Sequence, residues 1–187
     1  PEAVAKICAS TDVKKFVQVS AIGANEKSNS LYQKSKYLGE VNAFNNFNKT
    51  VVIRPSVVCG AEDNFTNLFS KLSFLPVIPI VGMNYKFQPI FVSDVADAII
   101  AAAKSAQRGF SYYNVATGSS ISNNEILQML REHVGNFEIT HAPERKGDVK
   151  HTLELIEKIT SELDWAPAHD FATGLVETLR WWKLVDE

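Results

Sequence analysis

Apolar residues recur along the chain in two patterns, one typical of strands and the other of helices. Short β-branched runs that end at turn residues, such as 51–53 before Arg54-Pro55, indicate buried strands. Longer segments with apolar residues at helical spacing, such as 32–47, indicate amphipathic helices. The patterns predict helices over 2–9, 32–47, 65–74, 95–104, 122–133, 153–163 and 171–184, and strands over 16–20, 51–53, 87–92, 112–116 and 138–140. This alternation predicts an α/β protein.

Length and charge narrow the possible classes of protein. The 187 residues suggest one domain or slightly more, and a net charge of −2 argues against a dedicated nucleic-acid binder. No uninterrupted apolar stretch is long enough to predict a membrane span. Two cysteines, Cys8 and Cys59, fit a reducing compartment, so we expect a cytoplasmic protein. The four histidines lack metal-ligand spacing, so no metal site is predicted.

Glycine spacing excludes the usual phosphate-binding loops. The nine glycines are never closer than nine residues apart, so neither a G-x-G-x-x-G dinucleotide loop nor a P-loop can be built from them. A nucleotide bound by this chain therefore needs a phosphate cradle from elsewhere. Because the chain begins at Pro1 without a signal segment, we expect it to have been cut from something larger.

Tyr32 and Lys36 are the first candidates for chemistry. They stand four residues apart near the start of a predicted helix, so both project from one face. A lysine ammonium beside a phenol favours the phenolate, which suits the phenol to general acid/base work. The spacing alone is weak, because such pairs also arise by chance. Ser20 adds weight, since it closes the preceding strand at the end where open α/β sheets bind ligands.

A wider set of motifs carries a family resemblance through nearly the whole chain. The stretches are Val-Ser-Ala-Ile-Gly-Ala at 19–24, Tyr-Gln-Lys-Ser-Lys at 32–36, Arg-Pro-Ser-Val-Val-Cys-Gly at 54–60, Phe-Val-Ser-Asp-Val-Ala at 91–96, Tyr-Asn-Val-Ala-Thr-Gly at 113–118, Glu-Arg-Lys-Gly-Asp-Val at 144–149 and Trp-Ala-Pro at 165–167. Together they resemble the extended short-chain dehydrogenase/reductase family of NAD-dependent epimerases and dehydratases. The resemblance implies the C-terminal part of a Rossmann NAD(P)-binding domain over 1–60. It also implies a smaller α+β substrate-binding domain over 61–187, with 85–105 returning to the Rossmann part.

The resemblance also implies roles for individual residues. Tyr32 matches the catalytic tyrosine, Lys36 matches the lysine that holds the nicotinamide ribose, and Ser20 is the candidate for the catalytic hydroxyl. The turn Pro55, Ser56 and Val57 matches the segment beside the nicotinamide of NAD or NADP. Arg145 matches an arginine that grips the diphosphate of a nucleotide sugar, for which a bidentate guanidinium is suited. Gln88 and Asp148 complete the implied substrate site.

Four positions depart from the family pattern. The family's serine or threonine falls at Ala21, which has no hydroxyl, so Ser20 could replace it only if the strand end shifts. Gln88 replaces a second phosphate-binding arginine, and Val57 replaces a substrate-contacting asparagine. Leu155 replaces a capping aspartate, whose loss costs a helix about 0.5–2 kcal/mol.

The two halves of the chain resemble different branches. Residues 16–100 resemble the nucleotide-binding accessory subunit of respiratory complex I, and residues 112–183 resemble UDP-glucose 4-epimerase. One hypothesis is therefore an epimerase or dehydratase that transfers hydride on a nucleotide sugar with tyrosine as acid/base, inactive as this truncated chain. The alternative is a non-catalytic NADPH-binding structural or assembly subunit, and a third is a fragment without activity.

The family's glycine loop and first strands would precede Pro1, which bears on partners. Without them the strands at 16–20 and 51–53 lack parallel neighbours on one side, and a bare edge invites pairing. We therefore expect this chain alone to bind dinucleotide poorly. Its expected partners are the missing N-terminal Rossmann segment or a second copy of the chain, as in a homodimer, besides the nucleotide-sugar substrate.

Overall fold

The computed structural model describes residues 1–63, 65–68, 77–106, 109–143 and 154–184. The chain divides into two compact units. Unit 1 comprises Pro1–Ser56, Ser93–Ala116 and Glu154–Ala166, and unit 2 comprises Val57–Val92, Thr117–Leu153 and Pro167–Glu187. Each unit is described by itself below.

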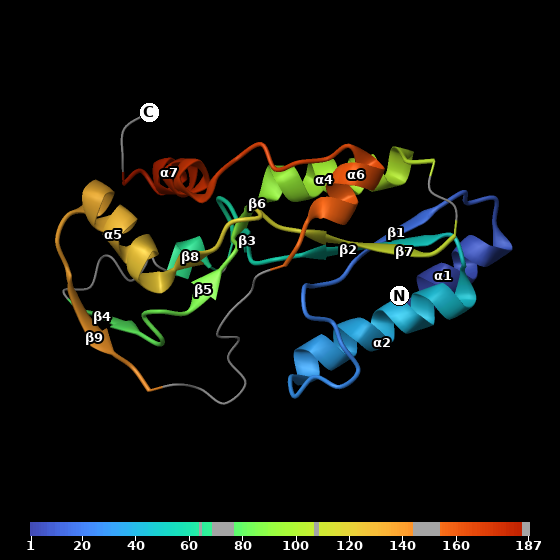
Figure 1. Ribbon diagram of the computed structural model, residues 1–187, viewed down its shortest axis with the longest axis horizontal. Helices are drawn as coiled ribbons and strands as arrows, with labels where there is room; N and C mark the ends of the chain where they lie inside the picture. Colours follow the sequence, from blue (N-terminus) through green and yellow to red (C-terminus); the bar gives the residue numbers. More distant parts are fainter. Residues whose placement is uncertain (64, 69–76, 107–108, 144–153, 185–187) are drawn as a thin grey trace. The chain divides into compact units, whose positions relative to one another are not determined.

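Unit 1 is built on a parallel sheet of three strands in the order β1-β2-β7. Its strands are β1 (Phe16–Val19), β2 (Thr50–Pro55) and β7 (Ser111–Val115). The β-branched residues of β2 are buried because the strand has a neighbour on each side and helices over both faces. Helices α1 (Glu2–Ser10) and α2 (Leu31–Asn46) lie on one side of this sheet, and α4 (Val92–Lys104) and α6 (Glu157–Leu163) lie on the other (Figure 1).

Small side chains let α1 and α2 pack closely. Ala5 and Cys8 of α1 meet Ala43 of α2 and Phe47 in one buried cluster, with Phe16 of β1 packed against it. Cys8 and Cys59 are both buried free thiols.

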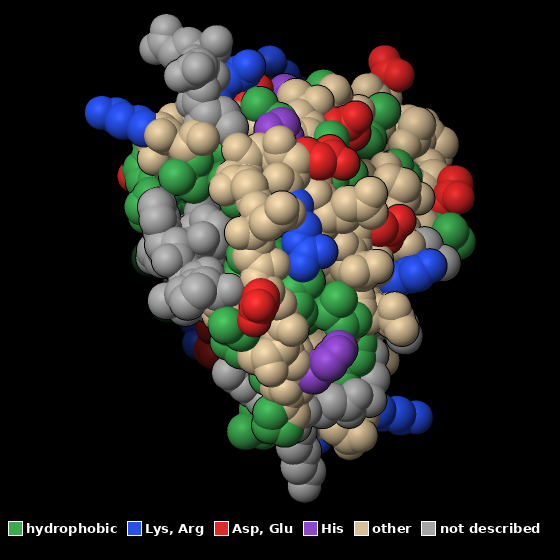
Figure 2. Space-filling view, turned by 90° about the vertical axis from the view of Figure 1, so that its left-hand side faces the viewer, with side chains coloured by type: hydrophobic (Ala, Val, Ile, Leu, Met, Phe, Trp, Pro, Cys, Tyr) green, Lys and Arg blue, Asp and Glu red, His purple; other side chains and the backbone are tan. Residues whose placement is uncertain are grey.

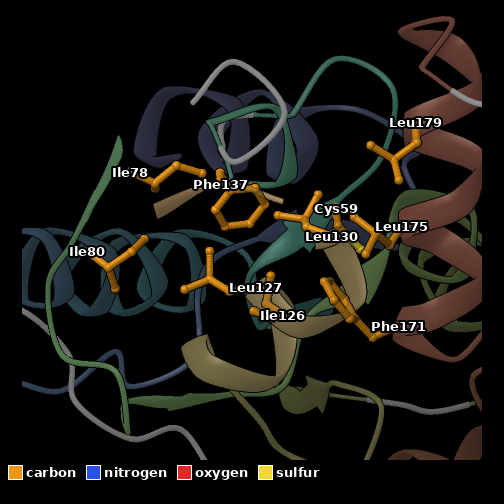
Figure 3. Packing of buried hydrophobic residues seen from close by; sticks show 10 residues of the cluster. All are labelled: Cys59, Ile78, Ile80, Ile126, Leu127, Leu130, Phe137, Phe171, Leu175 and Leu179. Carbon is orange, nitrogen blue, oxygen red and sulfur yellow. The ribbon is translucent and has the colours of Figure 1, made fainter. Parts of the chain in front are cut away.

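The described part of unit 2 includes short strand pairs and the helices α5 (Asn123–Val134) and α7 (Phe171–Trp181). The parallel pairs are β3 (Val58–Cys59) with β6 (Ile90–Phe91), and β4 (Val77–Ile80) with β9 (Glu138–His141). The antiparallel pair is β5 (Lys86–Phe87) with β8 (Ile121–Ser122). Helices α5 and α7 close one apolar core, in which Leu127 and Leu130 lie near Phe137 and Leu175 (Figure 3).

The capping signal at 122–125 is confirmed. The Ser122 hydroxyl accepts the Glu125 N–H, and the Glu125 carboxylate accepts the Ser122 N–H at 2.7 Å. This reciprocal arrangement satisfies two donors that a helix start otherwise leaves unpaired. Asp170 caps α7 in the same sense, since its carboxylate accepts the Thr173 N–H at 2.8 Å.

The predicted α/β class with parallel strands is confirmed, while several element boundaries differ. The strand expected over 87–92 is two short strands, because Pro89 between them has no N–H to donate. The helix expected from 153 begins at Glu157, after an Ile156 N-cap without a capping side chain. Most of the helix expected over 65–74 lies outside the described residues.

The division into units is more interleaved than the predicted domain boundaries. Unit 1 also includes 106–116 and 154–166, because β7 pairs with β2 and α6 packs on β7. That one unit serves a cofactor and the other a substrate stays a prediction.

Candidate functional site

The carboxyl ends of the three parallel strands in unit 1 are tied together by backbone hydrogen bonds. The Ser20 N–H donates to the Ile53 carbonyl at 2.7 Å, and the Ile22 N–H donates to the Pro55 carbonyl at 3.0 Å. The Ser56 N–H continues the ladder to the Val115 carbonyl at 2.9 Å. Ser20, Pro55 and Ser56 therefore lie at one edge of the sheet, the edge where open α/β sheets bind ligands.

Three hydroxyl groups of unit 1 are buried without a hydrogen-bond partner. They are the Oγ atoms of Ser20, Ser56 and Ser93, the last near the start of α4. An unpaired buried polar group costs about 1–3 kcal/mol, so such groups call for a ligand or a water molecule. The two hydroxyls at the strand ends can each donate a hydrogen bond to a polar ligand or accept one from it.

The Tyr32 and Lys36 side chains lie together on α2, as their spacing predicts. The Lys36 Nζ lies 5.3 Å from the centre of the Tyr32 ring. Tyr32 is exposed and Lys36 is half-buried, so a ligand can reach the phenol directly. Their catalytic and cofactor-binding roles stay predictions.

A buried ion pair joins α2 to β2. The guanidinium of Arg54 donates from Nε to the Glu40 Oε1 at 2.9 Å and from Nη2 to the Oε2 at 2.5 Å. The same guanidinium lies 4.2 Å from the centre of the Tyr112 ring. Glu40 follows Lys36 by one turn of α2, and Arg54 precedes Pro55 in β2. The pair therefore holds the helix of the Tyr–Lys pair against the strand that leads to Ser56.

Sequence reasoning missed this ion pair. Glu40 is not among the residues that the sequence singles out, although its place one turn after Lys36 sets it on the same side of the helix as the Tyr–Lys pair. The spacing of Glu40 and Arg54 along the chain does not predict their contact, because the contact depends on how a helix packs on a strand.

The other predicted site residues fall outside unit 1 or outside the described chain. Val57 and Gln88 belong to unit 2, where Val57 is half-buried and Gln88 is fully buried. Ala21 is half-buried directly after Ser20. Arg145 and Asp148 lie outside the described residues. The implied roles of these side chains in cofactor and substrate binding stay predictions.

The part of the chain that the structure describes has no candidate metal centre. Within that part, no three histidine, cysteine, aspartate or glutamate side chains cluster as metal ligands would. Figure 2 shows basic and acidic side chains interspersed on the face it presents. The strand ends of unit 1 are therefore the strongest candidate for a polar ligand.

A parallel sheet with helices on both faces gives unit 1 a Rossmann-like α/β fold. Solved structures share this fold. The chain is similar to MoeE5 in complex with UDP-glucuronic acid and NAD, with a TM-score of 0.86 and 22% identity over 97% of this chain and 69% of that one. It is also similar to the UDP-glucose 4-epimerase of Thermotoga maritima, with a TM-score of 0.85 and 22% identity over 96% of this chain and 67% of that one.

Sequence relatives come from two groups. Mouse NADH dehydrogenase [ubiquinone] 1 alpha subcomplex subunit 9, mitochondrial, is 35% identical over 56% of this chain and 28% of its own length. The Dictyostelium discoideum protein of the same name is 29% identical over 80% of this chain and 42% of its own length. dTDP-glucose 4,6-dehydratase of Streptomyces niveus is 30% identical over 57% of this chain and 32% of its own length. No family model matches the chain.

These relatives confirm the resemblance to the extended short-chain dehydrogenase/reductase family and a Rossmann-like fold. The chain spans less than half the length of the curated relatives it matches. Several similar structures contain NAD, which supports NAD(P) binding for the family. Among the described residues, no helix has the length and apolar character that crossing a bilayer requires.

Proposed function

We propose that the whole protein is an NAD(P)-dependent oxidoreductase of the epimerase/dehydratase type that acts on a nucleotide sugar, with Tyr32 as its acid/base. The observation that carries the proposal is the contact between Tyr32 and Lys36 on an exposed part of α2. Similar structures bind UDP-glucuronic acid or UDP-glucose together with NAD, or are NAD-containing dehydratases. The nicotinamide group, when bound, would supply the hydride chemistry.

In this proposal the chain's own residues orient the bound ligands and transfer one proton to and from the sugar. The Tyr32 phenolate, stabilised by the Lys36 ammonium, takes a proton from a sugar hydroxyl, and the phenol formed in this way returns that proton when the hydride goes back. The hydroxyls of Ser20 and Ser56, unpaired in the free chain, orient the ligand at the strand ends. Arg145, Gln88 and Asp148 are the proposed contacts to the sugar nucleotide.

The test pairs each site variant with a neighbour on the same helix. We expect Tyr32→Phe and Lys36→Met to abolish conversion of UDP-glucose or dTDP-glucose, followed by chromatography of the sugar nucleotides, while Tyr32→Phe retains dinucleotide binding. The controls Tyr37→Phe and Lys34→Met change neither property. Equal turnover by Tyr32→Phe and the unchanged protein would refute the proposal.

The proposal also includes a partner for the outer edge of β1. The N–H groups of Phe16 and Ser20 point to β2 and its flanks, so those of Val17 and Val19 point to the other edge. Val19 is also exposed on its face of the sheet, although an apolar side chain there is suited to burial. We propose that a further Rossmann segment or a second copy of the chain pairs with this edge and brings the phosphate-binding loop.

Titration with NADH and NADPH tests that partner. Energy transfer from tryptophan to the nicotinamide is expected to be weak for the 187-residue chain and to saturate when a Rossmann segment with a phosphate-binding loop is supplied. Tight binding by the chain alone, at concentrations where it sediments as a monomer, would refute the need for a partner. The preference between NADH and NADPH would come from the same titration.

A second candidate function is a non-catalytic NADPH-binding structural or assembly subunit. Ala21, which supplies no hydroxyl, and the buried neutral Gln88 favour it, as do relatives named as NADH dehydrogenase subunits. It predicts NADPH binding without sugar turnover and migration of the protein with a large complex in native gels. Cell fractionation tests localisation at the same time, since we propose a cytoplasmic protein while those relatives are named mitochondrial.

A further inference from the structure

Unit 2 contains a cleft that no proposed catalytic step uses. Its volume is about 720 Å³, within the range of about 300–1,000 Å³ that is usual for small-molecule sites. Its walls come from residues 57–63, from Phe65 and Val92, and from Trp181 at the end of α7. It shares only Val57 with the residues that the sequence assigns to cofactor or substrate.

The loop that forms one wall is held rigidly. The Asp63 carboxylate accepts the N–H groups of Gly60, Thr66 and Asn67 at 3.1, 3.0 and 2.8 Å. The Asn67 amide donates to the carbonyls of Ala61 and Asp63 at 3.0 and 2.8 Å, and its oxygen accepts the Nε1–H of Trp182. The loop is thereby fastened to the end of α7, so the cleft is formed before any ligand enters.

The walls offer an aromatic surface. Trp181 is 51% exposed although it lines the cleft, and its ring lies 5.3 Å from that of Trp182 in an edge-to-face arrangement. Phe65 and Val92 add apolar surface, and the Val92 side chain is also exposed. An indole that packs on one side only leaves its other face available to a planar group or a cation.

One carboxylate at this cleft is available to a ligand. Asp63 is occupied by the loop's own N–H groups, whereas Glu62 is exposed and takes part in none of the ion pairs within the described ranges. We propose that the cleft binds a small aromatic molecule that carries an ammonium group, with the ring against Trp181 and the charge beside Glu62. Indole faces and carboxylates both attract such cations.

A pair of ligands with opposite charge tests the proposal on the full chain. 2-Phenylethylammonium and 3-phenylpropionate share a ring and a similar tether, and neither absorbs where tryptophan is excited. We expect the amine to change tryptophan emission saturably, with half-saturation at or below about 5 mM. The carboxylate should bind at least about fivefold more weakly, because Glu62 repels it.

Two variants separate the charge from the cavity. Glu62→Gln should weaken amine binding about two- to fivefold, while Glu132→Gln on α5 serves as the matched control without effect. Ala61→Phe should abolish saturation by filling the cleft, with the far-UV circular dichroism of the chain unchanged. Equal binding of the two ligands, no binding of the amine, or unaltered binding by Ala61→Phe would each overturn the proposal.

Discussion

The ion pair between Glu40 and Arg54 provides the sharpest stability prediction. The side chains are 3% and 16% exposed and make two parallel hydrogen bonds. Breaking a buried pair by removing one partner costs about 3–5 kcal/mol, because the other charge stays buried. Since Arg54 keeps some contact with solvent, we expect Glu40→Ala to lower the free energy of unfolding of unit 1 by about 3 kcal/mol.

Urea unfolding can report on unit 1 alone. Trp165 is buried in unit 1 and its Nε1–H donates to the Asp94 carbonyl at 3.2 Å, whereas Trp181 and Trp182 belong to unit 2. In a background where the latter two are phenylalanine, tryptophan emission follows unit 1. With a denaturant slope of about 2 kcal/mol per molar urea, Glu40→Ala moves the midpoint by about 1.5 M. Glu40→Gln, which keeps the shape and part of the hydrogen bonding, shows a smaller shift and covers the case in which the alanine variant does not fold.

An exposed pair supplies the matched control. Lys6 and Glu2 are also joined by an ion pair, but their side chains are 61% and 49% exposed. Pairs of this kind contribute about 0–1 kcal/mol, so Lys6→Met should hardly move the midpoint. The double variant Glu40→Leu/Arg54→Met should recover much of the loss, since apolar replacements of a buried pair are often neutral. A loss for Glu40→Ala no larger than for Lys6→Met would refute the reasoning from burial.

The remaining predictions concern caps and pH. Ser122→Ala removes the α5 cap and should cost about 1 kcal/mol in urea unfolding followed by the tryptophans of unit 2. Hydrogen bonds from the Ser122 hydroxyl and N–H lower the pKa of Glu125 below its ordinary 4.5, so the stability it contributes is present above pH 4.5 and is lost as pH falls through the folded pKa. With Ser122→Ala, the free energy of unfolding should therefore fall less steeply as pH drops below 4.5. Burial, with the carboxylate of Glu162 beside the hydroxyl, raises the pKa of Tyr113 above 10.0, so its contribution is present below pH 10.0 and is lost as pH rises through the folded pKa. In thermal melts, Tyr113→Phe should not show this loss of stability above pH 10.0. A variant that loses stability at alkaline pH as the unchanged protein does would contradict this assignment.

Local signals explain which elements the sequence predicts well. The β-branched run of β2 and the Ser122–Glu125 capping box are encoded within a few residues, and both appear in the structure. Boundaries that depend on distant packing are predicted less well. The segment at 87–92 separates into two strands at Pro89, and these strands pair with different partners, β8 for β5 and β3 for β6. The proline signals the break, but no pattern within the segment indicates which strands will be the partners.

The candidate site divides in the same way. The helical spacing of Tyr32 and Lys36 is sufficient to place them side by side, and the end of a strand is sufficient to place Ser20 at the ligand edge. The unpaired state of the Ser20 and Ser56 hydroxyls could not be predicted, because it depends on every atom that packs around them. The Glu40–Arg54 ion pair could not be predicted for the same reason, since it is a contact between two different elements.

The two candidate functions require different properties of the residues at the carboxyl ends of the strands. Buried hydroxyls at Ser20 and Ser56 cost stability in the free chain, and a bound dinucleotide would satisfy them whether or not the protein is an enzyme. A structural subunit therefore accounts for them as well as an enzyme does. Tyr32 is 59% exposed and contributes little to packing, so a role in cofactor binding fits either function. Proton transfer needs its hydroxyl, whereas assembly does not, and this difference makes Tyr32→Phe the variant that separates chemistry from assembly.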